Sequence, residues 1–455
     1  MDSDLHKIKN GSNMEDMTVG DPKRLIVKFA VPICLSQLFQ LLYNTADSVI
    51  VGNFLGKSAL AAVSSSGTLI NLLVSFFEGM SMGAGVAISK YFGAGDYEKM
   101  SRAIHTNVAF GLVSGVTLTF FGVWSTPELL RWMGTDPHVL PQSIIYFRYY
   151  FYGALAVIMY NVFTSIMTAM GDSKTPLYYL IVSSILNIVL DVLFITVFHG
   201  GVGAAAIATT ISQVVSTLLC LYHLTRDGTV YKISLHKVRF YRDMMKEIIK
   251  YGLPTGVQNS VIGFANVIVQ TNINSFGEDA MAGYGSYAKI EGFAFLPITC
   301  FAMALATFIS QNLGAGKHGR AQEGAKFGII TSVTLAEAIG VFIFTCAPML
   351  IAMFNRDANV IAYGTQQART EALFFCLLAF SHCIAGICRG AGKAVVPMAI
   401  MLGVWCVFRI AYISAAMQVS HDIRLIFWAY PITWTISSVL YMVYYKKSDW
   451  VHGFD

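Results

Sequence analysis

The chain has 455 residues, of which 55% are hydrophobic and only 13% are charged, and its formal net charge is +5. Soluble domains carry about 25% charged residues, so this composition excludes an ordinary soluble protein and predicts one that crosses a membrane many times. The positive charge is explained by basic cytoplasmic loops and indicates no nucleic-acid partner.

Twelve apolar stretches follow a polar segment, residues 1–24, which lacks the apolar core and cleavage site of a signal peptide. Each stretch is near or above the ~20 residues that a spanning helix needs. They lie near residues 25–51, 58–90, 103–124, 142–169, 176–198, 202–224, 246–271, 280–311, 325–346, 364–388, 395–417 and 423–445. The predicted fold is an all-α membrane protein with twelve transmembrane helices.

Lys and Arg residues are distributed unequally between the two sides of this predicted topology. An even number of spans puts both termini on one side, and most of the 31 Lys and Arg residues lie in or beside the tails and loops of that side. The opposite loops contain only Lys57, Arg131, Arg356 and Arg424. The positive-inside rule therefore predicts cytoplasmic termini in a plasma membrane. Short tails and the absence of an organelle signal favour a bacterial one.

An internal repeat divides the chain into two halves. GKSALAAVSSS at 56–66 reappears as GEDAMAGYGSY at 277–287, and the loop that contains Gly171 matches the one that contains Gly392 at the same offset of 221 residues. Because this offset includes six spans, the halves have the same orientation, and we expect two pseudo-symmetric six-helix bundles. Parallel repeats of this kind are typical of secondary transporters.

The repeat also predicts the domain boundaries. A cytoplasmic tail at 1–24 precedes an N-lobe at 25–225, a linker at 226–245 and a C-lobe at 246–455 that ends in a short cytoplasmic tail. The linker is basic and amphipathic, so it is interpreted as a strap between the lobes, as an interfacial helix on anionic headgroups, or as both. The Gly-Ala-Gly loops lack the GxxxxGK[ST] pattern of a nucleotide site and are interpreted as tight turns.

Asp47 lies near the end of the first apolar stretch, in NTADSVIVG. A carboxylate at hydrocarbon depth costs roughly 2.5–3.5 kcal/mol, so such residues usually face a cavity and bind ions, protons or cationic ligands. The alternative is that Asp47 lies just outside the bilayer and caps the helix end.

A second carboxylate, Asp191, follows Asn187 by four residues in the fifth span, so the two share a helix face with Ser184. This polar stripe is expected to face the interior of the N-terminal bundle. Neighbouring spans offer further oxygen atoms, from Asn44, Asn161, Thr164, Thr209, Thr210 and Gln213. Oxygen ligands suit a hard cation, and paired carboxylates also favour proton uptake, so the pattern predicts Na⁺ or H⁺ as coupling ion. Alternatively, these polar groups only join helices.

Polar residues of the C-lobe complete the predicted substrate cavity. Gln258 and Asn259 lie in the seventh span, and Glu291 lies in the eighth. Glu291 is expected to pair with Arg409 or Lys289, because an unpaired buried charge is expensive; otherwise it meets a cationic substrate. The eight cysteines show no CxxC pairing and predict neither disulfides nor a metal site.

The two six-span halves, the first span with Pro32 and an aspartate, the YFGAGD and MGDSKTP loops and the NxxxD of the fifth span resemble the multidrug and toxic compound extrusion (MATE) family. Within it, the chain is similar to the branch of DNA-damage-inducible protein F. The resemblance implies that Asp47 and Asp191 bind the coupling proton or Na⁺, with Asn187 and Thr209 as companions, and that no other metal or cofactor is needed. It also implies that Asn161 lines the N-lobe cavity and that the first helix bends at Pro32.

We therefore expect a monomeric antiporter, not an enzyme, that exports amphipathic, cationic small molecules in exchange for Na⁺ or H⁺. Where another branch of the family has a glutamate in the seventh span, this chain has Gln258 and Asn259, which argues against coupling through the C-lobe by that scheme. One alternative is a flippase for lipids or lipid-linked sugars, but few Arg and Lys residues lie at membrane depth to bind pyrophosphate. An intramembrane enzyme would need a nucleophile with a base, or a metal cluster, and the sequence contains no motif for either.

Overall fold

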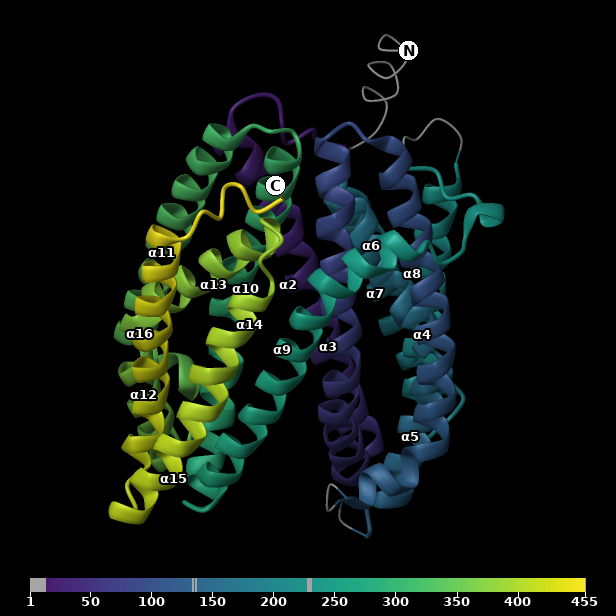
Figure 1. Ribbon diagram of the computed structural model, residues 1–455. Helices are drawn as coiled ribbons and strands as arrows, with labels where there is room; N and C mark the ends of the chain where they lie inside the picture. The colour runs from purple at the N-terminus through teal and green to yellow at the C-terminus, as the bar shows by residue number, and fades with distance from the viewer. Residues whose placement is uncertain (1–13, 133–134, 136, 227–230, 455) are drawn as a thin grey trace. The chain divides into compact units, whose positions relative to one another are not determined.

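All of the secondary structure in the described residues is helical. The structure is a computed structural model (Figure 1) that describes residues 14–132, 135, 137–226 and 231–454. Residues 1–13 of the predicted tail and 227–230 of the predicted linker lie outside this part of the chain. The chain forms two compact units. The first contains residues 35–256 with the described residues up to Asp16, and the second contains residues 17–34 and 257–455.

The first unit is built around α4, which packs against α3, α5 and α6, while α8 packs against α5, α6 and α7. Small residues let these helices approach closely: a Cβ atom at Gly122 would overlap the Phe151 ring, and one at Gly115 would overlap Leu155. Its elements are α3 (Lys57–Gly93), α4 (Tyr97–Trp132), α5 (Leu140–Tyr152), α6 (Ala154–Ala169), α7 (Lys174–Val192), the π-helical η1 (Leu193–Val197), α8 (Val202–Thr225) and the 3₁₀ turn η2 (Leu235–Lys237).

The second unit is built around α10, which packs against α11, α12 and α13, while α16 packs against α12 and α13. Phe308, Phe375 and Trp434 are among the largest fully buried side chains of its core. Its elements are α10 (Glu278–Gly314), α11 (His318–Ala352), α12 (Ala358–Glu371), the 3₁₀ turn η3 (Ala372–Phe374), α13 (Phe375–Gly390), α14 (Val395–Met401), the π-helical η4 (Leu402–Phe408), α15 (Arg409–Val419) and α16 (Ile423–Lys447).

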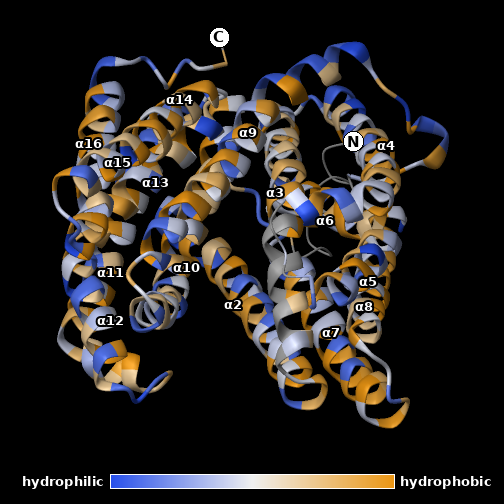
Figure 2. Cartoon of the chain, turned by 90° about the horizontal axis from the view of Figure 1, so that it is seen from below, coloured by the Kyte–Doolittle hydropathy of each residue, from blue (hydrophilic) through white to orange (hydrophobic). Residues whose placement is uncertain are grey.

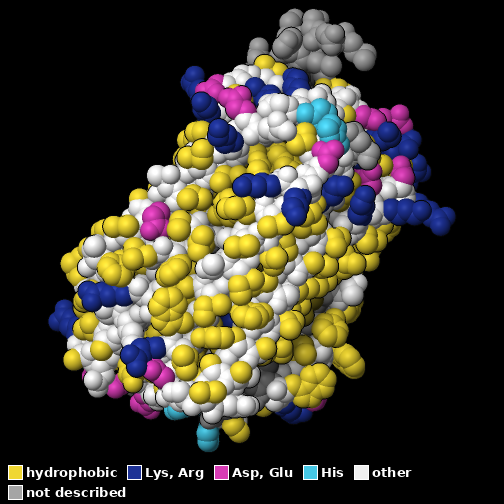
Figure 3. Space-filling view, turned by 60° about the vertical axis from the view of Figure 1, so that its left-hand side comes forward, with side chains coloured by type: hydrophobic (Ala, Val, Ile, Leu, Met, Phe, Trp, Pro, Cys, Tyr) yellow, Lys and Arg dark blue, Asp and Glu magenta, His cyan; other side chains and the backbone are white. Residues whose placement is uncertain are grey.

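Each of the twelve predicted spans corresponds to a helix or to consecutive helical segments. Ten helical segments of the described residues are long and apolar enough to cross a membrane, and α5 with α6 forms an eleventh candidate that bends by 48°. The remaining predicted span is α9 (Arg242–Asn274), whose amide side chains lower its hydropathy. Hydrophobic residues occur along most of the length of the helices (Figure 2). On the face shown in Figure 3, apolar side chains cover the middle and charged ones gather toward the ends.

The backbone confirms the internal repeat. Three pairs of glycines with positive φ are each 221 residues apart, the offset that the sequence predicts. They are Gly56 (87°) and Gly277 (96°), Gly95 (71°) and Gly316 (66°), and Gly171 (85°) and Gly392 (74°). Gly95 and Gly316 belong to the Gly-Ala-Gly loops, so the interpretation of these loops as tight turns is also confirmed.

Two helices change unit along their length, so the compact units differ from the predicted lobes. The helix α2 (Pro22–Leu55) passes from the second unit to the first after Cys34, because Ile26 and Phe29 are buried in the core of the second unit. The helix α9 passes from the first unit to the second after Gly256, because its first turns pack against α3. The functional lobes at 25–225 and 246–455 stay a prediction.

Residues 231–241 of the linker do not form the interfacial helix that one of the two interpretations predicted. Apart from η2, residues 231–241 contain no helix, and they pack against the first unit. Tyr231 and Ile233 are buried, and the backbone amide of Ser234 donates to His105 Nε2 on α4 at 3.0 Å. Buried side chains and a hydrogen bond to α4 therefore attach this segment to the first unit.

Candidate functional site

The two aspartates predicted from the sequence meet inside the first unit. Asp47 on α2 is 9% exposed and Asp191 on α7 is fully buried, and the two carboxyl groups lie within hydrogen-bonding reach of each other. Two carboxyl groups can share a hydrogen bond only when one of them carries a proton. Without it, two like charges face each other in a site that excludes most water, which is unfavourable.

Asn187 and Thr209 accompany this pair. Asn187 lies one helical turn before Asp191, and its Nδ2 donates to Thr209 Oγ1 on α8 at 3.4 Å. The Thr209 hydroxyl in turn donates to the Ala205 carbonyl of its own helix at 3.1 Å. The Asn187 amide is thereby oriented with its nitrogen toward Thr209, which leaves its carbonyl oxygen available.

Several buried oxygen atoms of this cluster have no hydrogen-bond donor among the described residues. They are Asp47 Oδ1, both Asp191 carboxylate oxygens, Asn187 Oδ1 and Ser184 Oγ. Buried acceptors normally have partners, and each unsatisfied one costs about 1–3 kcal/mol. A set of unsatisfied acceptors is completed by a proton or by a small hard cation. The residues present therefore fit Na⁺ or H⁺ by their chemistry.

Tyrosines that no sequence pattern singled out lie near the carboxylates. Tyr146 on α5 is 6% exposed and lies within electrostatic range of both Asp47 and Asp191. The Tyr43 hydroxyl, one turn before Asp47, lies within hydrogen-bonding reach of the Gln213 side chain. The signal was the aromatic run YFRYYFYG at 146–153, which is rich in residues that also anchor helices at membrane interfaces.

Glu78 on α3 adds a third carboxylate to the first unit. It lies within electrostatic range of Tyr43 and Tyr150, the latter on α5. Tyr43 thus interacts electrostatically with both Glu78 and Asp47. Among the polar residues predicted for this cavity, Gln213 joins the network through Tyr43.

Other predicted cavity residues make local bonds. The Asn161 amide donates to the Val157 carbonyl at 3.0 Å, and the Thr164 hydroxyl donates to the Tyr160 carbonyl at 3.0 Å, both within α6. Asn44 is exposed on α2. These contacts agree with the alternative that such side chains serve the helices, and the assignment of the three residues to a substrate cavity stays a prediction.

Gln258, Asn259 and Glu291 belong to the second unit and are not part of this cluster. Gln258 is 4% exposed, and its Nε2 lies 2.8 Å from Met401 Sδ; Asn259 is partly buried. Glu291 interacts electrostatically with Arg409, the first of its two expected partners. Lys289 instead lies 5.3 Å from the centroid of the Phe354 ring.

Pro32 lies in the part of α2 that belongs to the second unit, two residues before the helix changes unit. The helix is continuous through the proline. Proline cannot donate a backbone hydrogen bond to the preceding turn, and a bend of α2 at Pro32 stays a prediction.

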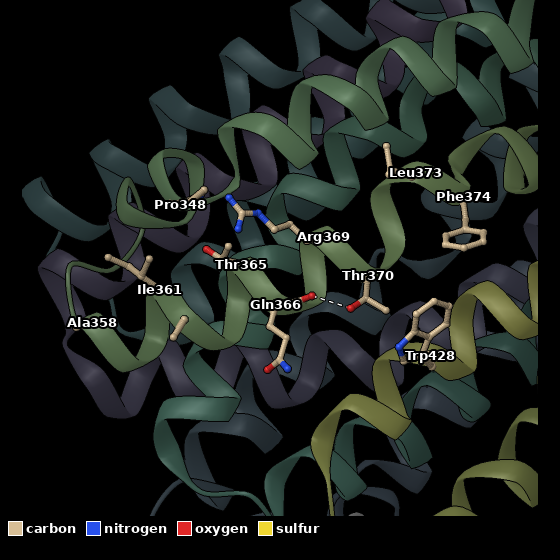
Figure 4. Close-up of a pocket in the computed structure, with 11 residues that line it drawn as sticks. Pro348, Ala358, Ile361, Thr365, Gln366, Arg369, Thr370, Leu373, Phe374 and Trp428 are labelled. Carbon is tan, nitrogen blue, oxygen red and sulfur yellow. Dashed lines mark hydrogen bonds between the residues drawn. The ribbon is translucent and has the colours of Figure 1, made fainter.

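A groove of about 770 Å³ opens on the second unit, formed by α11, η3 and residues of α12 and α16 (Figure 4). Ile361, Phe374 and Trp428 line it together with Arg369 and Gln366. None of the predicted site residues lines this groove. In the described part of the chain, no group of three or more His, Cys, Asp or Glu residues could hold a metal ion.

Comparison with known proteins identifies the class to which this fold belongs. The family model MatE matches residues 32–193 and 254–413, so the chain belongs to the MATE family, whose members are transporters and not enzymes. The chain is thus a multi-pass membrane transporter with structural relatives of the same twelve-helix fold. The branch of DNA-damage-inducible protein F stays a prediction.

Its relatives include two proteins of Bacillus subtilis (strain 168). The probable multidrug resistance protein YpnP is 28% identical over 379 residues, which are 83% of this chain and 84% of that protein. The probable multidrug resistance protein YoeA is 27% identical over 432 residues, 92% of each chain. A solved MOP superfamily transporter from Pyrococcus furiosus has a TM-score of 0.89 and 24% identity, covering 95% of this chain and 96% of that one.

Proposed function

We propose that this transporter is a secondary antiporter that exports amphipathic, cationic small molecules in exchange for H⁺ or Na⁺. The observation that carries the proposal is the buried pair of Asp47 and Asp191, in which Asp47 Oδ1 and both Asp191 carboxyl oxygens lack donors among the described residues. Two relatives of this chain in Bacillus subtilis are probable multidrug resistance proteins, which supports export of drug-like substrates.

In the proposed cycle, the pair binds the coupling ion in one state and releases it in another. A proton would be shared between the two carboxyl groups and remove one of two facing charges. Na⁺ would instead be bound by oxygens of Asp47, Asn187, Asp191 and Thr209. In either case the ion changes the charge of the cavity that the cationic substrate occupies, so ion and substrate favour different states.

The movement that follows is proposed to centre on α2. Asp47 and Pro32 lie on the same helix, and α2 changes unit two residues after the proline. Binding of an ion at Asp47 would therefore bias a bend at Pro32, where the helix lacks a hydrogen bond. We also propose a monomer in a bacterial plasma membrane with both termini in the cytoplasm, as the distribution of Lys and Arg indicates.

Efflux of a fluorescent organic cation from proteoliposomes tests the proposal, with a pH gradient and a sodium gradient imposed separately. We expect one gradient to drive efflux in the wild type, and Asp47→Asn and Asp191→Asn each to abolish it. Asp243→Asn is the matched control, because Asp243 is exposed at the start of α9 and forms an ion pair with Arg102 at 3.7 Å. This control should transport like the wild type.

Normal gradient-driven efflux in both cluster variants would overturn the coupling assignment. Scrambling of a fluorescent phospholipid in the same vesicles, without export of the dye, would instead support the flippase alternative. Folding of each variant is checked by its monodispersity in detergent before reconstitution.

A further inference from the structure

The second unit contains a buried polar cluster of its own, which the proposed coupling does not use. Its centre is Glu371, which is fully buried at the end of α12, and Arg409, which is 2% exposed at the start of α15. Both residues lie where a regular helix meets another helical form, the 3₁₀ turn η3 after Glu371 and the π-helical η4 before Arg409. Such irregularities are frequent at functional sites.

The cluster has defined contacts on several helices. Gln367 Nε2, one turn before Glu371, donates to Glu371 Oε1 at 3.0 Å. Arg409 Nη2 donates to Thr433 Oγ1 on α16 at 2.8 Å, and its guanidinium carbon lies 4.4 Å from the centroid of the Tyr430 ring. Arg409 is therefore held in place by α16, while Glu371 is held by its own helix.

The titratable and charged groups that face Glu371 come from α10, α15 and α16. Electrostatic interactions link it to Glu291 and Tyr287 on α10 and to Arg409 on α15; Tyr284 and Tyr430 complete the set. The Tyr284 and Tyr430 hydroxyl oxygens are 3.3 Å apart. With both glutamates ionised, two negative charges would face the single positive charge of Arg409.

Four buried polar atoms in this cluster lack a hydrogen-bond partner among the described residues. They are Glu371 Oε2, Gln367 Oε1, the Tyr287 hydroxyl oxygen and Arg409 Nε. An uncompensated buried charge is costly, and Glu371 Oε2 is an acceptor without a donor. A proton on Glu371 Oε2 would remove the excess charge and supply a donor for the Tyr287 oxygen, which already lies near this carboxyl group.

We propose that Glu371 is a proton-binding site in the second unit, in which Tyr287 and Gln367 hold the protonated carboxyl group and Arg409 is left to balance Glu291. The nearby guanidinium repels a metal cation, so a proton fits this cluster better than Na⁺. The site goes beyond the proposed coupling at Asp47 and Asp191, which belong to the first unit. It requires neither of these residues and can be tested without transport.

Infrared spectroscopy of the full chain in lipid nanodiscs tests the site, recorded against pH in the Asp47→Asn, Asp191→Asn, Glu78→Gln background, which removes the carboxyl groups of the first-unit cluster. The carbonyl stretch of a protonated carboxyl group reports the bound proton, and ¹³C-labelled glutamate assigns the band to Glu. We expect a band at neutral pH, where exposed glutamates are ionised, that disappears at high pH and is absent at neutral pH after Glu371→Gln. Glu323→Gln, on the exposed surface of α11, should leave the band unchanged.

Two further variants report on the surroundings of the proton. Tyr287→Phe removes the acceptor, so the band should persist at a higher frequency. Glu291→Gln frees Arg409 to pair with Glu371, so the proton should leave at a pH about one unit lower, a tenfold change in affinity. If Glu371→Gln does not fold, the frequency shift in Tyr287→Phe carries the test.

A glutamate band that Glu371→Gln leaves intact would overturn the proposal. So would the loss of the band on addition of Na⁺ at constant pH, because the site would then bind a metal cation. Failure of dye efflux in vesicles would contradict the proposed antiport but would leave this spectroscopic result untouched, so the two proposals fail separately.

Discussion

The Asp47 carboxyl group on α2 lies within hydrogen-bonding reach of the Asp191 carboxyl group on α7. These two helices lie far apart in the chain, and each contains a single aspartate. The two aspartates meet in the first unit. Residues that share one proton or one ion act as a single functional group, so their effects on transport should not add.

We predict that Asp47→Asn, Asp191→Asn and the double variant all lose gradient-driven efflux to the same extent, by at least roughly tenfold. The physical reason is that either substitution destroys the shared site, so the second removes nothing further. Initial rates in proteoliposomes at matched protein content measure the effect. A double variant whose loss equals the product of the two single losses would indicate two independent sites.

Gly171→Ala should destabilise the protein more than Gly95→Ala. Both glycines have positive φ, which costs alanine about 1–2 kcal/mol. A Cβ atom at Gly171 would also overlap the Glu15 carbonyl oxygen, whereas one at Gly95 would meet open space. Thermal unfolding in detergent compares the two variants, and equal melting temperatures would show that the Glu15 contact is unimportant.

Gly252→Ala should weaken the packing of α9 on α3. A Cβ atom at Gly252 would lie 2.7 Å from the Met80 carbonyl oxygen, so the helices would have to separate at a cost of about 1–3 kcal/mol. Gly285→Ala is the control, because its Cβ meets nothing within 4 Å on α10 and should be neutral or stabilising by about 0.5–1 kcal/mol. The free energy of unfolding in mixed micelles measures both, and a neutral Gly252→Ala would contradict the close contact.

Asp422 should stabilise α16 in a pH-dependent way. Its carboxylate accepts from the backbone amide of Arg424 at 2.9 Å and pairs with the Arg424 guanidinium at 2.7 Å, and these contacts lower the pKa of Asp422. Because the folded-state pKa lies below the unfolded one, this contribution is present at neutral pH and is lost as the pH falls through the folded-state value. Asp422→Ala should cost about 1 kcal/mol at neutral pH.

The control for this prediction is Asp422→Asn, which keeps a capping oxygen but has no charge to titrate. Melting temperatures measured from neutral to acidic pH should fall more in the wild type than in Asp422→Asn. Parallel curves would show that the carboxylate contributes nothing through its charge.

Apolar stretches, the 221-residue repeat and Asp47 with Asp191 could be found in the sequence because each is a local or periodic property. Hydrophobic length marks a spanning helix, and a carboxylate within such a stretch is rare enough to be noticed without knowing its neighbours. Gly56, Gly95 and Gly171 have positive φ, and the glycines 221 residues later in the repeat have positive φ as well. The resemblance to the MATE family depends on the same repeat and the same aspartates.

Only the tertiary structure decided which polar side chains meet. No sequence pattern singled out Tyr146 or Glu371, yet the first interacts electrostatically with the aspartates and the second with Arg409. The passage of α2 and α9 from one unit to the other was equally hidden. The physical reason is that burial and pairing depend on contacts between helices distant in the chain, whereas composition and periodicity describe each helix alone.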